Sequence, residues 1–569
     1  MFLSLPLLGT LIASTVALDS SPLELRVPHL HQLSQLSKSH QASLNQDSAS
    51  FPVYNLSVPI DHFHNESRYE PHTNATFGLR YWLDTSHYQP GGPVFVIAAG
   101  ETDGSDRIPF LSQGVVTQLA AAYHGIGLIL EHRYYGESYP FTNLTTENIR
   151  FLTTEQALAD YAYFASNIVF PGLEDLDLTA ATTPWIAYGG SYAGAFVAFL
   201  RKLYPELYWG AVSSSGVTEA IIDYWEYYEP IRLYGPSQCI STIQTSIDIV
   251  DRILIDHADN KTLAQQLKSA FGGSATNLSN QDFVSSLSYG LDSFQSRNWD
   301  KSIGTPLFRA FCNNITNSDL LYPETAEPIS ASVKQLVQIA GYDPSNTTLV
   351  TNLLNWIGFL STSKVFADSS SESSSSNITN FTTPQPLSKD SGTSWNYQVC
   401  VEWGYFTTGS SVPSTTKPLI SRLLDLPYLS SFCPNTFGIK TPPDVQRINQ
   451  FGGFNFSYPR VAIIGGLADP WRDATPLADG VDWQSRKSSD SEPIILLDIP
   501  AADVWDGVRG AVHHWDQNGL SGQQKKEGEK APKEIVSVHE EVVRFVGVWL
   551  KEWKGEQSDA DERVYQTIL

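Results

Sequence analysis

The chain has 569 residues, of which 41% are hydrophobic and 12% aromatic, so it can bury a full core and is not disordered throughout. Charged residues make up only 17%, and the formal net charge of −24 excludes nucleic acid and anionic membranes as expected partners. The length allows two or more average domains, or one enzyme domain with a large insertion.

Residues 1–17 have the pattern of a secretory signal peptide. The segment from Phe2 to Val16 is almost continuously apolar, and small residues before Ala17 offer a cleavage site. Residues 18–50 show no clear period and are predicted to be a flexible leader or propeptide. No later stretch reaches the ~18 apolar residues needed to cross a bilayer, so we expect no membrane span in the mature protein.

Two further features agree with secretion. The first is a set of N-x-S/T sequons, at Asn55, Asn65, Asn74, Asn143, Asn260, Asn277, Asn314, Asn346, Asn377, Asn380 and Asn455. The second is an even number of cysteines, which predicts two disulfides in three alternative connectivities among Cys239, Cys312, Cys400 and Cys433. No Cys-x-x-Cys pair or His/Cys cluster indicates a metal, and we expect no cofactor.

Strands and helices alternate over residues 51–216. Strands are predicted, in chain order, at residues 60–63, 76–82, 93–99, 127–130, 185–188 and 209–213. The first two are expected at an antiparallel edge, whereas the later ones are short apolar runs typical of buried parallel strands. A helix is expected to end near Leu119, and Thr153 to Gln156 has the pattern of a capping box that opens another. The pattern predicts a parallel α/β sheet.

A serine lies at the reversal from the predicted strand at 185–188 to a helix that ends before Pro205. The turn reads Gly189-Gly190-Ser191-Tyr192-Ala193-Gly194, with small residues two positions before and after the serine. Such a strained turn needs small neighbours and is typical of a nucleophile elbow. The alternatives are a phosphate-binding turn or a glycine-rich loop with a bystander serine.

The alternation ends at about residue 216. Residues 217–450 have mainly helical patterns, contain all four cysteines and include a serine-rich run at 369–376. We interpret this segment as a helical cap inserted into the sheet domain, with a separate binding domain as the alternative. Strand patterns return at 460–465 and 493–499, so residues 451–569 are predicted to complete the sheet and to end in a helix.

Both late strands lead to candidate catalytic residues. Asp469 follows the first, and His513 follows the second, in the order Ser…Asp…His that α/β-hydrolases use. A hydroxyl, an imidazole and a buried carboxylate are the three groups needed for acyl transfer by a serine. The rival carboxylates are Asp473 and Asp479, which lie further from the strand end, and the rival base is His539, in the terminal helix.

The chain also resembles the S28 serine peptidases, which include prolyl carboxypeptidase, dipeptidyl peptidase II and fungal acid prolyl endopeptidases. The similar motifs are Asp61-His62-Phe63, the blocks at 131–138, 189–192 and 395–402, Asp469-Pro470-Trp471, and Ala511-Val512-His513-His514. The matches run from about residue 58 to 553. The resemblance implies an α/β-hydrolase fold with a large helical cap, and cleavage of proline-containing peptides or proteins after proline.

Carried over by position, the resemblance makes Ser191 the nucleophile, Asp469 the orienting carboxylate and His513 the base, in preference to His514. The backbone N–H of Tyr192 and one from Gly100 or Glu101 would form the oxyanion hole. Trp471, with Tyr405 from the cap, would line the proline pocket. The resemblance also implies the disulfides Cys400–Cys433 and Cys239–Cys312. We interpret Arg133 and His132 as structural, because a charge in the middle of such a block usually ties loops together.

The chain departs from the family pattern at two places. Asn518 stands where prolyl carboxypeptidase has an arginine, and the serine-rich run has no clear counterpart. These departures bear on the exopeptidase subtype and on the pH range. The rival hypotheses are an esterase or lipase, which the lack of an HGGG-type motif disfavours, and a catalytically inactive binding protein, which the intact triad disfavours.

Overall fold

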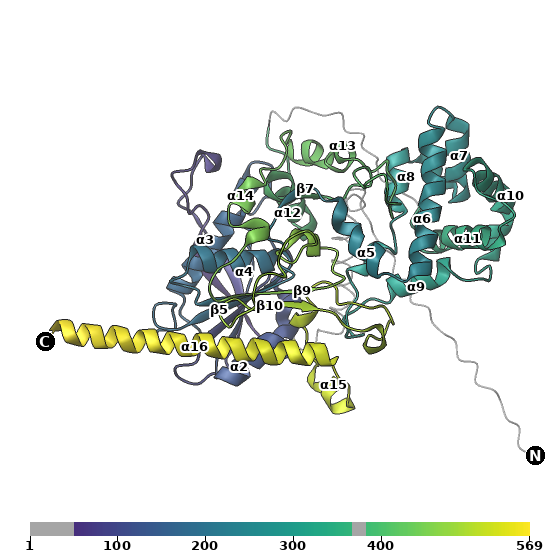
Figure 1. Cartoon of the computed structure of the whole chain (residues 1–569). Coiled ribbons are helices and arrows are strands. Elements are labelled where there is room, and N and C mark those ends of the chain that lie inside the picture. The colour runs from purple at the N-terminus through teal and green to yellow at the C-terminus, as the bar shows by residue number, and fades with distance from the viewer. Residues whose placement is uncertain (1–50, 367–382, 569) are drawn as a thin grey trace, which may run out of the picture.

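A computed structural model describes residues 51–366 and 383–568. The predicted signal peptide and leader, the serine-rich run, Asn377 and Asn380 therefore lie outside the described residues. Figure 1 shows an α/β body, crossed by a long C-terminal helix, and a lobe of helices beside it.

An eight-stranded sheet in the order β1-β2-β4-β3-β5-β6-β9-β10 forms the centre of the body. Its strands are β1 (Val53–Pro59), β2 (Thr76–Asp84), β3 (Val94–Ala98), β4 (Ile126–Leu130), β5 (Trp185–Gly190), β6 (Gly210–Ser214), β9 (Val461–Gly466) and β10 (Ile494–Leu497). β1 and β2 pair antiparallel, β2 pairs antiparallel with β4, and every later pair is parallel. β3 to β6 are almost entirely buried, as their continuous apolar runs predict. The topology is that of an α/β-hydrolase.

The first strand lies earlier in the chain than predicted. β1 ends at Pro59, and the predicted strand at 60–63 belongs to the connection between β1 and β2. This connection is held by Gln156, whose side chain accepts from the His62 N–H and donates to Asp61, both at 2.9 Å. Gln156 is the residue that the predicted capping box would use, so only half of the box forms: Thr153 Oγ1 accepts from the Gln156 N–H at 3.3 Å.

Helices cover both faces of the sheet (Figure 1). α3 (Thr154–Asn167) and α4 (Tyr192–Leu203) pack together on one face, and α2 (Val115–Tyr123) contacts α16 (Lys533–Ile568) on the other. The Trp209 indole donates to the Trp549 carbonyl at 2.6 Å, which ties the terminal helix to the sheet. Among the described residues, no helix combines the length and hydropathy that a membrane span requires.

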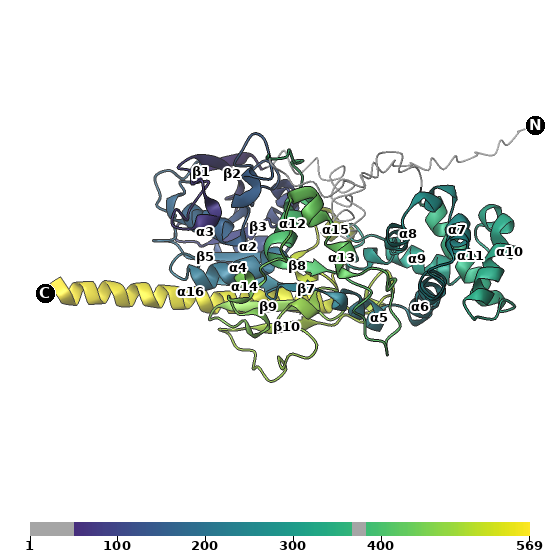
Figure 2. The ribbon, with the colours of Figure 1, turned by 90° about the horizontal axis from the view of Figure 1, so that it is seen from above.

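The cap is inserted between β6 and β9. Figures 1 and 2 show that α6 (Ser237–Asp251), α7 (Lys261–Ala270), α8 (Asn280–Ser286), α9 (Leu307–Ile315), α10 (Pro323–Ile339) and α11 (Thr347–Thr362) form the outer lobe. The remaining α-helices of the cap are α5 (Glu229–Tyr234), α12 (Ser391–Gln398), α13 (Leu426–Leu429) and α14 (Gln446–Asn449). The cap also has a short parallel pair, β7 (Ile221–Asp223) and β8 (Gly404–Phe406), that sequence analysis did not predict. Three-residue strands leave too short a pattern to detect.

Two disulfides lie within the cap, in the pairing that the family resemblance implies. Cys239 of α6 is bonded to Cys312 of α9, and Cys400 is bonded to Cys433, with Cα–Cα distances of 5.2 and 5.6 Å. Eight of the nine sequon asparagines among the described residues are exposed. The exception is Asn314, which is half-buried and donates from its side chain to the Ala310 carbonyl.

Removing the longer-range disulfide is expected to weaken the cap before the sheet. The double variant Cys239→Ser/Cys312→Ser opens a link between residues 73 positions apart, and its free energy of unfolding should fall by ~2–5 kcal/mol. Chemical denaturation measures this loss. The matched control is the Cys400→Ser/Cys433→Ser variant, whose two cysteines are 33 positions apart in the sequence. Peptide mapping that links Cys239 to Cys400 or Cys433 would contradict the pairing.

Candidate active site

Ser191 lies on a strained turn between β5 and α4. Its φ of 63° and ψ of −129° are rarely adopted by a residue with a side chain. The turn is so tight that a Cβ at Gly189 would lie 2.0 Å from the Ala193 carbonyl oxygen. The Ser191 N–H donates to the Ser214 carbonyl of β6 at 2.9 Å, and the residue stays partly exposed. The turn therefore has the strained backbone geometry that the sequence pattern predicts, and Ser191 as the nucleophile stays a prediction.

Asp469 and His513 meet beyond the carboxyl ends of β9 and β10. His513 Nδ1 lies 3.0 Å from each carboxylate oxygen of Asp469, and both side chains are buried. The Trp471 N–H donates to the same carboxylate at 3.0 Å and helps to fix its position. A carboxylate accepts only, so it selects the imidazole tautomer with the proton on Nδ1 and leaves Nε2 able to accept a proton.

The rival residues have other partners. Asp473 accepts from the Asp479 N–H at 2.7 Å, and Asp479 forms an ion pair with Arg472. His539 bonds through Nε2 to the Asp516 carbonyl at 2.7 Å, on the α16 side of the sheet. Burial, together with the charges of His513 and Arg107, lowers the pKa of His514 well below its ordinary value. The geometry favours Asp469 and His513 over all of them.

The histidine loop contacts the elbow directly. A Cβ at Gly190, next to Ser191, would lie 3.0 Å from the His514 ring, and the two histidine rings are 4.6 Å apart. His513 Nε2 is buried and has no hydrogen-bond partner among the described residues, so the bond to Ser191 is not formed. Catalytic hydrogen bonds are often long or poorly aligned without substrate, so this geometry is compatible with Ser191 and His513 as partners.

The predicted oxyanion-hole segments also lie together. Gly100, with φ of 73°, follows β3, and a Cβ there would lie 3.1 Å from the Ala193 Cβ in the first turn of α4. The Tyr192 N–H belongs to that turn, where backbone donors have no intrahelical acceptor. Burial raises the pKa of Glu101, against the charges of Arg107 and His513, and its Oε2 has no partner among the described residues.

Sequence analysis missed the residues that hold the histidine loop against the sheet. The buried carboxylate of Asp516 accepts from the Tyr188 hydroxyl of β5 at 2.8 Å and from the Ser214 hydroxyl of β6. His132 contacts the residue that follows Ser191, with Nε2 2.8 Å from the Tyr192 hydroxyl. Burial lowers the pKa of His132 to about 4, so this imidazole is neutral and structural.

Trp471 lies in a box of aromatic side chains beside His513. Its ring centroid is 6.4 Å from that of His513 and 5.0 Å from that of Tyr405, the cap residue predicted to share the pocket wall. Tyr224 stacks on the indole at 5.4 Å, and Tyr227 meets it edge-on at the same distance. Tyr224 and Tyr227 follow β7, and no sequence pattern singled them out.

A cap segment, residues 295–299, binds the two loops that carry Asp469 and His513; we call it the clamp segment. The Trp471 indole donates to Gln295 Oε1 at 2.8 Å, which ties the aspartate loop to the clamp segment. The Trp515 indole donates to the Arg297 carbonyl at 2.8 Å, and the Trp299 indole returns a bond to the Trp515 carbonyl at 3.0 Å. The cap therefore helps to position the loops that carry Asp469 and His513.

A buried ion pair reinforces the same contact. Arg297 donates to Asp506 at 2.6 Å and to the Val508 carbonyl at 2.5 Å, and both members of the pair are almost fully buried. Asp506 precedes His513 in the loop after β10. Separating a buried ion pair leaves a charge without its partner and costs free energy. The pair therefore opposes movement of this loop away from the cap.

Comparison with known proteins places this site in a family. A family model described as serine carboxypeptidase S28 matches residues 58–483, which include Ser191 and Asp469. A probable extracellular serine carboxypeptidase of Arthroderma benhamiae is 43% identical over 529 residues, covering 92% of this chain and 71% of that protein. The serine protease vicPb of Bipolaris victoriae is 26% identical over 460 residues, covering 77% and 81%.

Among solved structures, a thermostable carboxylesterase from a metagenomic library is 14% identical, with a TM-score of 0.23. The match covers 38% of this chain and 62% of the esterase. A similarity this low does not support a fold assignment, and the fold is assigned from the sheet topology. The family model, which matches most of the length, and the 43% identical relative decide the affiliation. The chain belongs to the serine carboxypeptidase S28 family.

Proposed function

We propose that the protein is a secreted serine peptidase that hydrolyses peptide bonds after proline through an acyl-enzyme formed on Ser191. The observation that supports this most strongly is His513 Nδ1 between the two oxygens of Asp469, in a loop that contacts the strained elbow. Secretion is supported by the N-terminal apolar segment, by the two disulfides and by the extracellular relative.

The proposed reaction uses each group once in each half. Ser191 Oγ attacks the scissile carbonyl carbon while His513 Nε2 takes the hydroxyl proton, and Asp469 stabilises the resulting imidazolium. The N–H groups of Tyr192 and the loop at 100–101 stabilise the oxyanion. His513 then gives its proton to the leaving amine. In the second half, water attacks the ester carbonyl carbon and gives a proton to His513 Nε2. His513 returns that proton to Ser191 Oγ as the ester bond breaks and the acid product leaves.

The aromatic box supports proline as the residue on the acyl side. Proline has a locked φ and no N–H, so a pocket can select it by shape and apolar contact alone. Trp471 is 7% exposed and backed by three tyrosines, which makes the wall rigid. Because Trp471 follows Asp469 by two residues, the pocket wall and the charge-orienting group lie on one loop.

Proline preference is tested by replacing the wall. Trp471→Ala should raise KM for peptides cleaved after proline and reduce the proline-over-alanine preference from ~10–200-fold towards unity. Labelling of Ser191 by a fluorophosphonate should persist. Trp483→Ala, a half-buried tryptophan that packs against the core, is the matched control and should keep the preference. A wild-type enzyme that cleaves after leucine or lysine as readily as after proline would refute the pocket.

The same assay separates the modes of cleavage. Peptides with a single internal proline are offered with both ends free, with a blocked amino end and with a blocked carboxyl end. A carboxypeptidase requires the free carboxyl end, a dipeptidyl peptidase requires the free amino end, and an endopeptidase requires neither. Wild-type protein and Ser191→Ala are compared on all three substrates.

A further inference from the structure

The connection between β1 and β2 brings together three side chains with metal-ligand chemistry. One oxygen or nitrogen atom from each of Asp61, His64 and His72 lies within 4.8 Å of the other two. Sequence analysis found no metal pattern because Asp61 and His72 are eleven positions apart and become neighbours only when the connection folds back on itself. The Ile60 N–H donates to the Ala75 carbonyl at 3.0 Å and closes the base of this loop.

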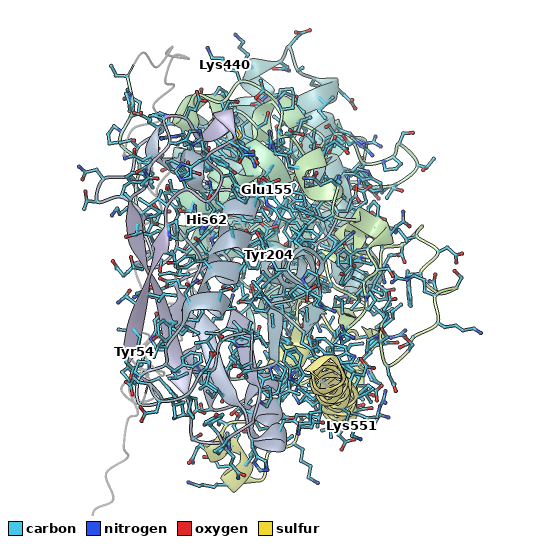
Figure 3. All side chains as sticks on the ribbon, turned by 90° about the vertical axis from the view of Figure 1, so that its left-hand side faces the viewer. Tyr54, His62, Glu155, Tyr204, Lys440 and Lys551 are labelled. Atoms are coloured by element: carbon cyan, nitrogen blue, oxygen red, sulfur yellow. A yellow bond between two sulfur atoms is a disulfide. The ribbon has the colours of Figure 1, made fainter. Side chains whose placement is uncertain are left out.

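The carboxylate of Asp61 is held in one orientation. Its Oδ1 accepts from the Phe63 N–H and from the Gln156 side chain, both at 2.9 Å, and its side chain is fully buried. The next residue, His62, which Figure 3 labels together with Glu155 of α3, donates its backbone N–H to the Gln156 side chain at 2.9 Å. Outer hydrogen bonds of this kind orient the carboxylates that bind metals.

The second oxygen of Asp61 faces the two imidazoles. Oδ2 lies 2.7 Å from His72 Nδ1, and the rings of His72 and His64 are 5.4 Å apart. The burial of Asp61 would raise its pKa, but the hydrogen bonds from His72, Phe63 and Gln156 outweigh it and lower the pKa. His62 is not part of this group, since its Nε2 bonds to Asp160 at 2.8 Å on the inner side of the loop.

We propose that Asp61, His64 and His72 form a zinc-binding site that is separate from the active site. Two imidazole nitrogens and one carboxylate oxygen are ligands that zinc accepts, with water in the fourth position. Ligand atoms around a tetrahedral zinc are about 3.3 Å apart, so the observed spread needs only a small adjustment. His64 is exposed and can move towards the ion. Asp61 and His72 already lie 2.7 Å apart through Oδ2 and Nδ1, and zinc would replace the proton that their hydrogen bond shares, with release of that proton.

Zinc at this site would close the connection between β1 and β2 on itself, because all three ligands belong to that connection. β1 is the outermost strand of the sheet, and the connection is held to α3 by the bonds of Gln156, by His62 with Asp160 and by Arg68 with Glu155. The role is structural, because the ligands come from the edge of the sheet and none belongs to the elbow or to the loops after β9 and β10. Zinc binding is thus expected to change stability and to leave hydrolysis unchanged.

The test is a zinc titration of the full-length secreted protein after treatment with a chelator. Calorimetry and competition with a chromophoric chelator should give one zinc ion per chain, and zinc should raise the melting temperature. Calcium should not replace it, because a site with two imidazoles is unsuited to that ion. Hydrolysis measured in parallel should be equal with and without zinc, which keeps the result independent of the proposed function.

The variants make the test specific. His64→Ala should weaken zinc binding at least tenfold and abolish the zinc-dependent shift in melting temperature. Because His64 is exposed, this variant is expected to fold normally. His72→Ala should have the same effect on binding, and His87→Ala, at another exposed histidine, is the matched control. The proposal is overturned by the absence of stoichiometric zinc binding, or by equal binding in wild type and His64→Ala.

Discussion

Ser191→Ala is expected to lower kcat for peptide hydrolysis by ~10⁶, since loss of a serine nucleophile costs about as much as loss of a whole triad. The variant should fold normally, because alanine adopts the same turn, with φ of 63°, under the same strain as serine. The measurements are the hydrolysis rate, labelling by a fluorophosphonate and the far-ultraviolet circular dichroism spectrum.

The control for this experiment is Ser166→Ala, which removes a partly buried hydroxyl that donates to the Ala162 carbonyl in α3. That variant should keep wild-type labelling. A single labelled peptide containing Ser191 is expected from the wild-type protein. Labelling that persists in Ser191→Ala, or hydrolysis within tenfold of wild type, would end the assignment of the nucleophile.

Asp469→Asn is expected to lower kcat by ~10⁴ while the fold is retained. The carboxylate of Asp469 accepts from His513 Nδ1, whereas an asparagine can present its NH₂ group to that nitrogen. The imidazole would then carry its proton on Nε2, facing Ser191, and could no longer accept the hydroxyl proton. The loss should appear in kcat more than in KM.

The matched control is Asp473→Asn, four residues along the same loop. Asp473 accepts from the Asp479 N–H and makes no contact with His513 that would set its tautomer. We expect this variant to stay within about tenfold of wild type, against the ~10⁴ of the tautomer effect. A large loss in Asp473→Asn together with a small loss in Asp469→Asn would exchange their roles.

The sheet and the elbow were accessible from the sequence because their signals are local. The apolar runs of β3 to β6 report burial on both faces, and the small residues around Ser191 report a turn too tight for side chains. The order Ser…Asp…His followed from strand ends. The preference for Asp469 over Asp473 and Asp479 also came from the sequence, through its place at a strand end and the family resemblance, and the contact of Asp469 with His513 supports it.

The remaining features depend on contacts between distant parts of the chain. Trp471 and Gln295 are 176 positions apart, and Tyr188 and Asp516 are 328 apart, so no periodic pattern connects them. The error at the first strand has the same origin. The segment at 60–63 has an apolar pattern, but the Gln156 side chain holds it as a loop, and that use of Gln156 also leaves the capping box half formed.

The clamp segment carries no proposed catalytic group, but it helps to hold the loop of His513, the proposed general base. Lifting the cap as a rigid lid would break three indole hydrogen bonds and expose the Arg297–Asp506 pair, so the histidine loop would keep its bonds to β5 and β6 through Asp516 but lose its bonds to the cap. If the protein acts as proposed, we therefore expect substrate to enter past a cap that stays docked. A protease that cut the cap free is therefore expected to lower the proposed activity and not to raise it: the remaining body would keep Ser191 on its strained turn and lose the cap contacts that help to order His513.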